Sequence, residues 1–209
     1  MKTILCFGDS NTWGWNPHTL SRHARDERWP GVLRNALGED FLVIEEGQNG
    51  RTTVWDDPIE GHKNGLTYLP PCLESHAPLD LVIIMLGSND LKARFSVTAF
   101  DIAQSAGVLV DVVQKSAFGP DGNPPQVLLM SPPEIGKLTG FAGMFEGGVE
   151  KSRKLGAYYR QVAEERNCYF LDVAQIVVTD DADGVHLDRS EHEKLGKAVA
   201  SQVRSIFSV

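Results

Sequence analysis

Cysteine is scarce in this sequence, and long apolar runs are missing from it. The three cysteines, Cys6, Cys72 and Cys168, are scattered and form no C-x-x-C pair. Such a set indicates neither a disulfide framework nor a zinc site, and we expect the thiols to be buried as small apolar side chains. No run approaches the length of about 20 apolar residues that a membrane-spanning helix needs. We therefore expect no membrane partner, no signal peptide and a reducing, cytoplasmic setting.

Basic side chains are also fewer than acidic ones. The 209 residues include 28 acidic side chains against 20 Lys and Arg, which gives a formal net charge of −8. No stretch is markedly basic, and this argues against nucleic acid or anionic lipid as the main partner. The remaining composition is 42% hydrophobic and 23% charged, which is ordinary for a globular chain. A chain of this size buries enough apolar surface to fold without a metal or a disulfide.

Five short apolar segments rich in Ile, Val and Leu recur along the chain. This pattern is typical of strands that are covered on both faces. The predicted strands are Thr3–Phe7, Phe41–Glu45, Leu81–Leu86, Val127–Met130 and Cys168–Leu171.

Amphipathic segments lie between these strands or after them. Ser190 is the predicted cap of the last helix, with Glu193 completing a capping box. A further segment, Tyr68–His76, is a weaker helix prediction because Pro70 and Pro71 interrupt it. The other predicted helices are Trp29–Leu37, Thr98–Ala117, Gly148–Arg166 and Ser190–Phe207.

The alternation of strand and helix predicts a single α/β domain over residues 1–209, with a parallel five-stranded sheet between layers of helices. Two connections, from Asp9 to Arg28 and from Ser131 to about Gly148, are longer than such a fold needs. Long connections in a compact α/β domain usually line a binding site. Each connection contains a pair of aromatic residues, Trp13 and Trp15 in the first and Phe141 and Phe145 in the second. These side chains either line the site or pack in the core or between subunits.

Polar residues follow three of the predicted strands. Ser10 follows the first strand, Asn49 and Gly50 the second, and Ser88 and Asn89 the third. In parallel α/β sheets, ligands bind at the carboxyl ends of the strands. We therefore expect these groups to meet in one site.

A serine hydroxyl becomes a nucleophile when a base takes its proton and a third group orients that base. Among six histidines, only His186 has a carboxylate three residues before it in a glycine-containing loop, at Asp183. A carboxylate at that spacing can hold Nδ1–H and leave Nε2 free. The alternative interpretation is a surface loop with an incidental histidine.

A developing oxyanion needs preorganised donors. Candidates are the backbone N–H groups of Ser10 and Gly50 and the side-chain amide of Asn89. Taken singly, Gly50 is also explained as a turn glycine, and Asn89 as a cap or turn residue.

Four short motifs resemble the blocks of the SGNH hydrolases, the GDSL-type esterases and lipases. They are Phe7-Gly8-Asp9-Ser10, Asn49-Gly50, Gly87-Ser88-Asn89-Asp90 and Asp183-Gly184-Val185-His186, in the family's order over almost the whole chain. The similarity is closest to the bacterial arylesterase and acyltransferase branch, in the stretches FGDSNTWGW, VIEEGQNGRTT, LPPCLESHAPLDLVIIMLGSND and DGVHL.

This resemblance implies a three-layer α/β/α sandwich like that of flavodoxin. It implies that Ser10 is the nucleophile, His186 the general base and acid, and Asp183 the group that orients His186. Ser10, Gly50 and Asn89 would form the oxyanion hole. The sequence departs from the GDSL pattern at Asn11, where the family has leucine. The predicted substrate-binding residues are Asn11, Trp13, Asn49, Ser88, Phe141 and Phe145.

The expected function is a serine esterase for short-chain acyl and aryl esters, with transfer of the acyl group to alcohols or peroxide also open. A carbohydrate acetylesterase is the alternative within the same chemistry, and a non-catalytic flavodoxin-like binding protein is the alternative outside it. The first connection lacks the glycine motifs of nucleotide-binding loops, and the nucleophile does not lie in G-x-S-x-G. TDDADG does not fit a calcium loop, and Cys72 with His76 is interpreted as structural. We expect no cofactor, no metal, a small-molecule ester as partner, and assembly into a homo-oligomer.

Overall fold

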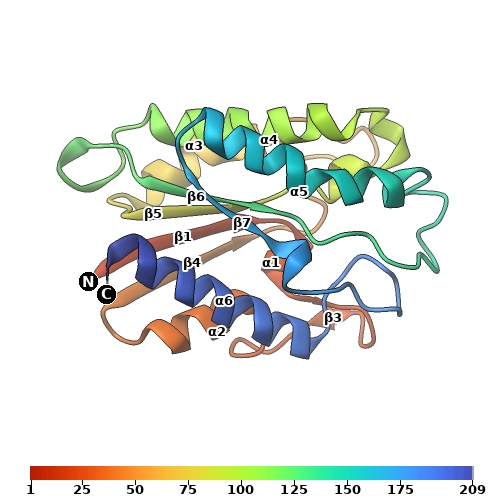
Figure 1. Cartoon of the computed structure of the whole chain (residues 1–209), viewed down its shortest axis with the longest axis horizontal. Helices are drawn as coiled ribbons and strands as arrows, with labels where there is room; N and C mark the ends of the chain where they lie inside the picture. Colours follow the sequence, from red (N-terminus) through yellow and green to blue (C-terminus); the bar gives the residue numbers. More distant parts are fainter. Residues whose placement is uncertain (209) are drawn as a thin grey trace.

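The central sheet has five parallel strands in the order β4-β1-β5-β6-β7 (Figure 1). The structure is a computed structural model that describes residues 1–208. The order places the first strand between the second and the third, as in flavodoxin-like sheets. The strands are β1 (Lys2–Gly8), β4 (Phe41–Gly47), β5 (Leu81–Met85), β6 (Gln126–Ser131) and β7 (Tyr169–Asp172).

Alternate side chains of each inner strand enter two separate hydrophobic cores. Leu5 and Phe7 of β1 pack into one core, and Ile4 and Cys6 pack into the other. All of β5 is buried. Because successive side chains of a strand point to opposite faces, a continuous apolar run is the pattern that a sheet covered on both faces requires.

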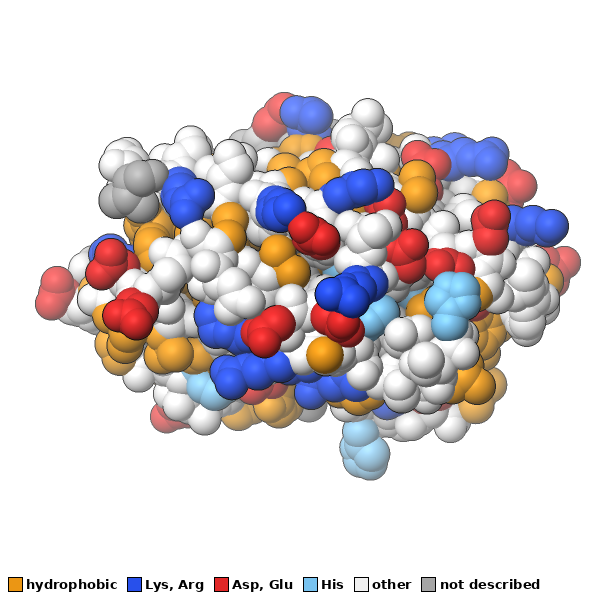
Figure 2. All heavy atoms as spheres, turned by 90° about the horizontal axis from the view of Figure 1, so that it is seen from below, with side chains coloured by type: hydrophobic (Ala, Val, Ile, Leu, Met, Phe, Trp, Pro, Cys, Tyr) orange, Lys and Arg blue, Asp and Glu red, His pale blue; other side chains and the backbone are white. Residues whose placement is uncertain are grey.

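Helices cover both faces of the sheet and make three layers, as the sequence predicts (Figure 1). Figure 2 views the layer of α2 and α6 from outside, where acidic and basic side chains are interspersed. No helix within residues 1–208 is long and apolar enough to cross a membrane. One layer contains α2 (Trp29–Leu37) and α6 (Arg189–Phe207), and the other contains α3 (Gly65–His76), α4 (Ala99–Gln114) and α5 (Gly148–Glu165).

Helix α3 is more regular than its prolines indicate. It begins at Gly65, with the Asn64 side chain accepting a hydrogen bond from the Thr67 N–H, and it continues through Pro70 and Pro71 to His76. Each proline removes one helical donor. Leu69, Cys72 and Leu73 on the same helix are buried, so packing against the sheet outweighs the weak local propensity.

The cap of α6 differs from the predicted one. Asp188, not Ser190, is the N-cap, and its carboxylate accepts a hydrogen bond from the Glu191 N–H at 2.8 Å. Ser190 lies in the first turn and donates its hydroxyl to Asp188. Both residues are good caps, and the loop that precedes the helix decides between them.

Small elements fill the first of the two long connections, from Asp9 to Arg28. A four-residue helix α1 (Ser10–Trp13) follows β1 directly, and a two-stranded ribbon of β2 (Trp15–Asn16) and β3 (Ser21–Arg22) follows α1. Four 3₁₀ turns complete the described structure: η1 (Asn89–Leu91), η2 (Ala93–Phe95), η3 (Pro120–Gly122) and η4 (Val173–Gln175).

Candidate functional site

Ser10 lies where the strand order reverses, at the carboxyl end of β1. Asp9 caps α1 by accepting a hydrogen bond from the Asn11 N–H at 2.9 Å, so the chain turns sharply after Gly8. A Cβ atom on Gly8 would collide with the Thr12 side chain, and glycine permits this tight turn. The turn presents the Ser10 hydroxyl at the edge of the sheet, 7% exposed.

The structure brings Ser10, His186 and Asp183 together across 176 residues of chain. Ser10 Oγ lies 2.9 Å from His186 Nε2, and His186 Nδ1 lies 2.6 Å from Asp183 Oδ2. A carboxylate accepts only, so Nδ1 carries the proton of a neutral imidazole and Nε2 accepts from the serine hydroxyl. This is the arrangement in which a histidine can take a proton from a serine.

The Asp183 carboxylate is held from two sides. Its Oδ1 accepts hydrogen bonds from the backbone N–H groups of Val185 at 2.8 Å and His186 at 2.9 Å. Burial raises the pKa of Asp183, but its hydrogen bonds and the positive charge that His186 has when protonated outweigh burial and leave the pKa below its ordinary value. The group therefore stays ionised while it orients the imidazole.

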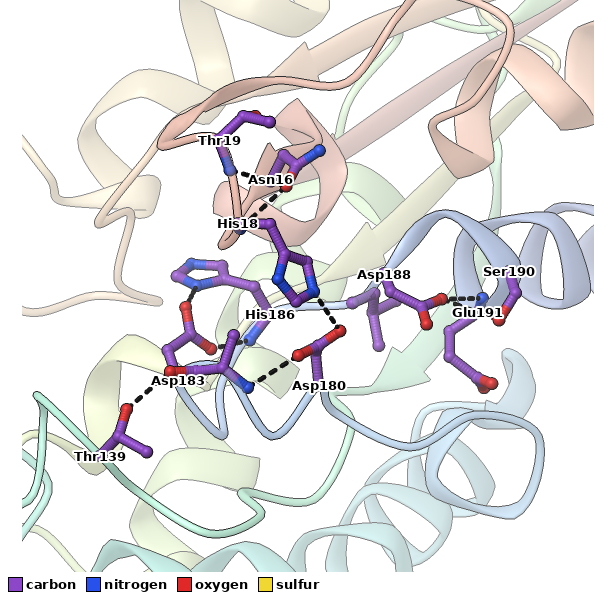
Figure 3. A network of polar contacts seen from close by, with 12 residues as sticks. Asn16, His18, Thr19, Thr139, Asp180, Asp183, His186, Asp188, Ser190 and Glu191 are labelled. Atoms are coloured by element: carbon purple, nitrogen blue, oxygen red, sulfur yellow. Dashed lines mark hydrogen bonds and ion pairs between the residues drawn. The ribbon is translucent and has the colours of Figure 1, made fainter.

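Both long connections hold the loop that carries His186 (Figure 3). His18 Nε2 lies 2.9 Å from Asp180 Oδ2, and Thr139 donates its hydroxyl to the Ala182 carbonyl at 2.6 Å. Asp180 also receives a backbone hydrogen bond from Gly184. Segments that are distant in sequence thus fix the position of one imidazole.

Asn11 is a clamp beside His186. Its Nδ2 donates to the Val185 carbonyl at 3.2 Å, and its Oδ1 accepts from the Leu187 N–H at 3.1 Å. The side chain is 1% exposed. The expectation that Asn11 binds substrate is therefore corrected, because both ends of its amide are bonded to the backbone on either side of His186.

The three residues predicted to supply oxyanion donors, Ser10, Gly50 and Asn89, line one cavity. Among residues 1–208, the N–H groups of Ser10 and Gly50 have no hydrogen-bond acceptor. The Asn89 amide donates one hydrogen to the Arg51 carbonyl at 3.1 Å, which fixes its orientation, and within the described residues the second hydrogen has no acceptor. Gly50 has φ +80°, a conformation that side-chain-bearing residues rarely adopt.

Arg51 links the segments that supply these donors. Its guanidinium donates to the Gly8 carbonyl at 2.8 Å and to the Glu46 carbonyl, and it lies 4.2 Å from the centre of the Phe7 ring. Its own carbonyl accepts from Asn89. One buried residue, 3% exposed, therefore ties the end of β1 to the Gly50 turn and to the Asn89 amide.

Two buried carboxyl groups lie beneath the site. Burial raises the pKa of Asp90 to about 6, against hydrogen bonds from the Thr53 N–H and hydroxyl that lower it. Burial also raises the pKa of Asp9, against the Asn11 N–H and the charge of His186. Neither carboxyl group contacts the cavity, so their role is in holding the backbone.

A cavity of about 220 Å³ opens over Ser10 and His186. Gly50 and Asn89 line it, and so do the predicted residues Asn49, Phe141 and Phe145. Phe145 is nonetheless 3% exposed and belongs mainly to the core. Phe141 and Phe145 thus contribute both to the cavity wall and to core packing.

A sequence model of the GDSL-like Lipase/Acylhydrolase family matches residues 6–193. The chain belongs to this family.

Solved structures of the family resemble the chain over its whole length. The inhibitor-bound aryl esterase of M. smegmatis is 46% identical, with a TM-score of 0.95, 98% of this chain covered and 99% of that one. A carbohydrate acetylesterase family member from Sinorhizobium meliloti is 42% identical, with a TM-score of 0.95 and both chains fully covered. No curated protein sequence matches significantly. The fold and the family assign this acylhydrolase to the carboxylic ester hydrolases.

Two predicted substrate-binding residues of this acylhydrolase, Ser88 and Trp13, do not line the cavity. Ser88 is 5% exposed at the start of η1. The Trp13 ring is 6.2 Å from that of Trp15 and 4.9 Å from the Arg22 guanidinium. Trp15 lines the cavity in place of Trp13, because the turn after α1 directs the second tryptophan inward.

Sequence reasoning missed several residues of the acylhydrolase cavity. Glu60, Lys92, Met144 and Val185 line it in addition to Trp15. Val185 stands inside the D-x-x-H motif, and Met144 lies between the predicted residues Phe141 and Phe145. No pattern in the sequence marks Glu60 or Lys92.

Glu46, Cys72 and His76 are the one group of metal-ligand side chains that gathers within residues 1–208, with ligand atoms within 4.8 Å of one another. Burial and Glu46 raise the pKa of the Cys72 thiol to about 12, so in the absence of a metal ion it stays protonated. His76 Nε2 is already 2.9 Å from a Glu46 oxygen. The expectation of no metal stays a prediction.

Proposed function

We propose that this chain is a serine esterase that hydrolyses short-chain acyl and aryl esters through an acyl-enzyme intermediate. The contact between Ser10 Oγ and His186 Nε2, with Asp183 behind the imidazole, carries the proposal. Ser10 attacks the ester carbonyl while His186 takes its proton. The oxyanion is stabilised by the N–H groups of Ser10 and Gly50 and by the free amide hydrogen of Asn89.

His186 then gives its proton to the departing alcohol, and the acyl group remains on Ser10. Water attacks the acyl-enzyme with His186 as base, which returns the free serine. Another alcohol or peroxide in place of water completes an acyl transfer. The Trp15 and Phe141 rings, at 6.0 and 6.4 Å from the imidazole, support transfer because apolar surroundings keep water scarce near His186.

A carbohydrate acetylesterase is the second candidate. The similarity to the Sinorhizobium meliloti protein, which carries that description, favours it. The same groups would perform the reaction on a different alcohol.

We also propose that residues 1–209 form one domain that assembles as a homo-oligomer in the cytoplasm, without nucleic acid or membrane as partner. Met144 lines the cavity and is 37% exposed, and Ile59 is 75% exposed. Exposed apolar side chains such as these support a contact between copies of the chain. Light scattering after gel filtration measures the oligomeric state.

The experiment that tests the proposed function is Ser10→Ala. We expect hydrolysis of phenyl acetate to fall by at least about a thousandfold, with an unchanged melting temperature. A fluorophosphonate should label the wild type at Ser10 and leave the variant unlabelled, as mass spectrometry of the peptides will report. Ser201→Ala, on an exposed position of α6, is the control. Turnover by Ser10→Ala close to that of the wild type would refute the proposal.

A further inference from the structure

A charged pair forms part of the cavity wall. Lys92 and Glu60 both line the cavity, and Lys92 Nζ donates to Glu60 Oε1. The Lys92 side chain is 3% exposed and that of Glu60 is 31% exposed. Lysine is rarely buried so deeply unless it is paired, so the pair is a built feature of the site.

Asp57 and Arg94 join this pair in a group of four charges that is neutral overall. The fully buried Asp57 carboxylate lies 3.8 Å from Lys92 Nζ and 3.0 Å from Arg94 Nη1. Arg94 Nη2 lies 3.4 Å from Glu60 Oε1. Two carboxylates thus face two cations, so the group needs no charge from a substrate.

The pair keeps hydrogen-bonding capacity toward the cavity. Among residues 1–208, Glu60 Oε2 has no hydrogen-bond donor, and it lies over Gly50, where a Cβ atom would collide with it. The Lys92 ammonium has three donors and makes one short contact. One acceptor and at least one donor therefore stand beside the proposed oxyanion hole.

Much of the remaining cavity wall is apolar. Trp15 and Phe141 flank His186, and Met144 and Phe145 continue this surface. The alcohol oxygen of the ester must reach His186 to take up a proton, so the alcohol lies in this cavity, where the aromatic rings and the charged pair are both within its wall. An alkyl chain there would cover a carboxylate oxygen without giving it a partner, which is unfavourable.

We propose that Glu60 and Lys92 form a hydroxyl-binding subsite, and that the preferred substrates are short-chain esters of alcohols with further free hydroxyl groups. A hydroxyl group both donates and accepts, which matches Glu60 Oε2 and Lys92 Nζ together. The carbon skeleton of such an alcohol packs against the aromatic side. This inference rests on the proposed function, since it assigns the alcohol to the site at Ser10.

The test compares two acetates that differ only in hydroxyl groups, glycerol monoacetate and propyl acetate, with phenyl acetate as a reference. We expect wild-type kcat/KM to favour glycerol monoacetate over propyl acetate by about tenfold or more, as one hydrogen bond to a charged group provides. In the double variant Glu60→Gln with Lys92→Met, which removes both charges together, this ratio should fall toward one. Glu60→Gln alone should lower it part of the way.

The control is Glu193→Gln with Lys197→Met, which removes an exposed Glu–Lys pair of α6 and should keep the wild-type ratio. A wild-type ratio near one overturns the inference and needs no variant to fold. A folded double variant that keeps the full ratio overturns it as well. Failure of the wild type on phenyl acetate and on both other acetates would instead contradict the proposed function.

Discussion

At the scale of single residues, the site depends on side chains that hold the backbone. Asn11 bonds to the backbone on both sides of His186, and Arg51 bonds to the end of β1 and accepts from Asn89. At position 11 the GDSL pattern has leucine, whose side chain has no polar atoms and cannot make these hydrogen bonds. In this chain the asparagine amide positions the imidazole that leucine would only pack against.

Replacement of Asn11 by alanine tests this positioning role. The Val185 carbonyl and the Leu187 N–H would lose their buried partner, each at a cost of about 1–3 kcal/mol. We expect a lower free energy of unfolding in urea and a fall in kcat at little-changed KM. Asn35→Ala, at an exposed hydrogen bond to Asp26, is the control and should change neither quantity. An unaltered kcat in Asn11→Ala would exclude the clamp.

Asp183→Asn tests how the imidazole is oriented. An amide in place of the carboxylate either loses the bond to Nδ1 or favours the tautomer that protonates Nε2, which cannot take the serine proton. We expect kcat on phenyl acetate to fall by on the order of a thousandfold, with a much smaller change in KM. Asp181→Asn, at an exposed position of the same loop, should keep its rate. If Asp183→Asn retains its kcat, another carboxylate orients His186.

At the scale of elements, the loop before α6 decides where that helix begins. The chain leaves His186 in a fixed position, so Asp188 arrives two residues later with its carboxylate over the first turn of the helix. Ser190 follows inside the helix, and its hydroxyl bonds to the same carboxylate. A local pattern cannot distinguish the two, because both residue types cap helices well.

Two variants separate these caps. Asp188→Ala should lower the free energy of unfolding by about 1 kcal/mol, which in a chain of this size lowers Tm by about 2–4 °C. Ser190→Ala should cost less, since the bond from Asp188 to the Glu191 N–H remains. Calorimetric melting of both variants checks the order. A larger loss in Ser190→Ala would favour the cap predicted from sequence.

At the scale of the whole molecule, the site is assembled over buried carboxyl groups that oppose folding when they ionise. The pKa of Asp90 is about 6, above its usual value of 3.8. The folded chain therefore binds this proton more tightly than the unfolded chain does. The contribution of Asp90 to the free energy of unfolding therefore increases as pH falls from about 6 to about 4. Asp183 acts in the opposite direction, because its pKa is lowered on folding and its contribution is lost as pH falls below that range.

The pH dependence of unfolding measures this contribution. Each pKa unit corresponds to about 1.4 kcal/mol, so Asp90 should make the free energy of unfolding about 3 kcal/mol lower at neutral pH than at about pH 4. Asp90→Asn cannot ionise and should have a flatter curve between about pH 4 and about pH 6. Asp121→Asn, on an exposed turn, is the control. Parallel curves for wild type and Asp90→Asn would contradict the assignment.

The sequence by itself determined the sheet and the motif residues. Apolar runs that both faces of a sheet must bury identify the five strands, because that pattern depends on local burial alone. The helix Trp29–Leu37 was predicted to the residue. The short motifs identified Ser10, Asp183 and His186, which the structure brings together, while their catalytic roles stay proposals.

Only the tertiary structure decided the surroundings of those residues. It left Asn11, Ser88 and Trp13 out of the cavity wall and placed Trp15, Glu60 and Lys92 in it. The physical reason is that which way a side chain faces after a turn, and which distant segment packs against it, depends on contacts between residues far apart in the chain. Glu60 and Lys92 are 32 residues apart, and no local pattern around either residue predicts that the two side chains meet.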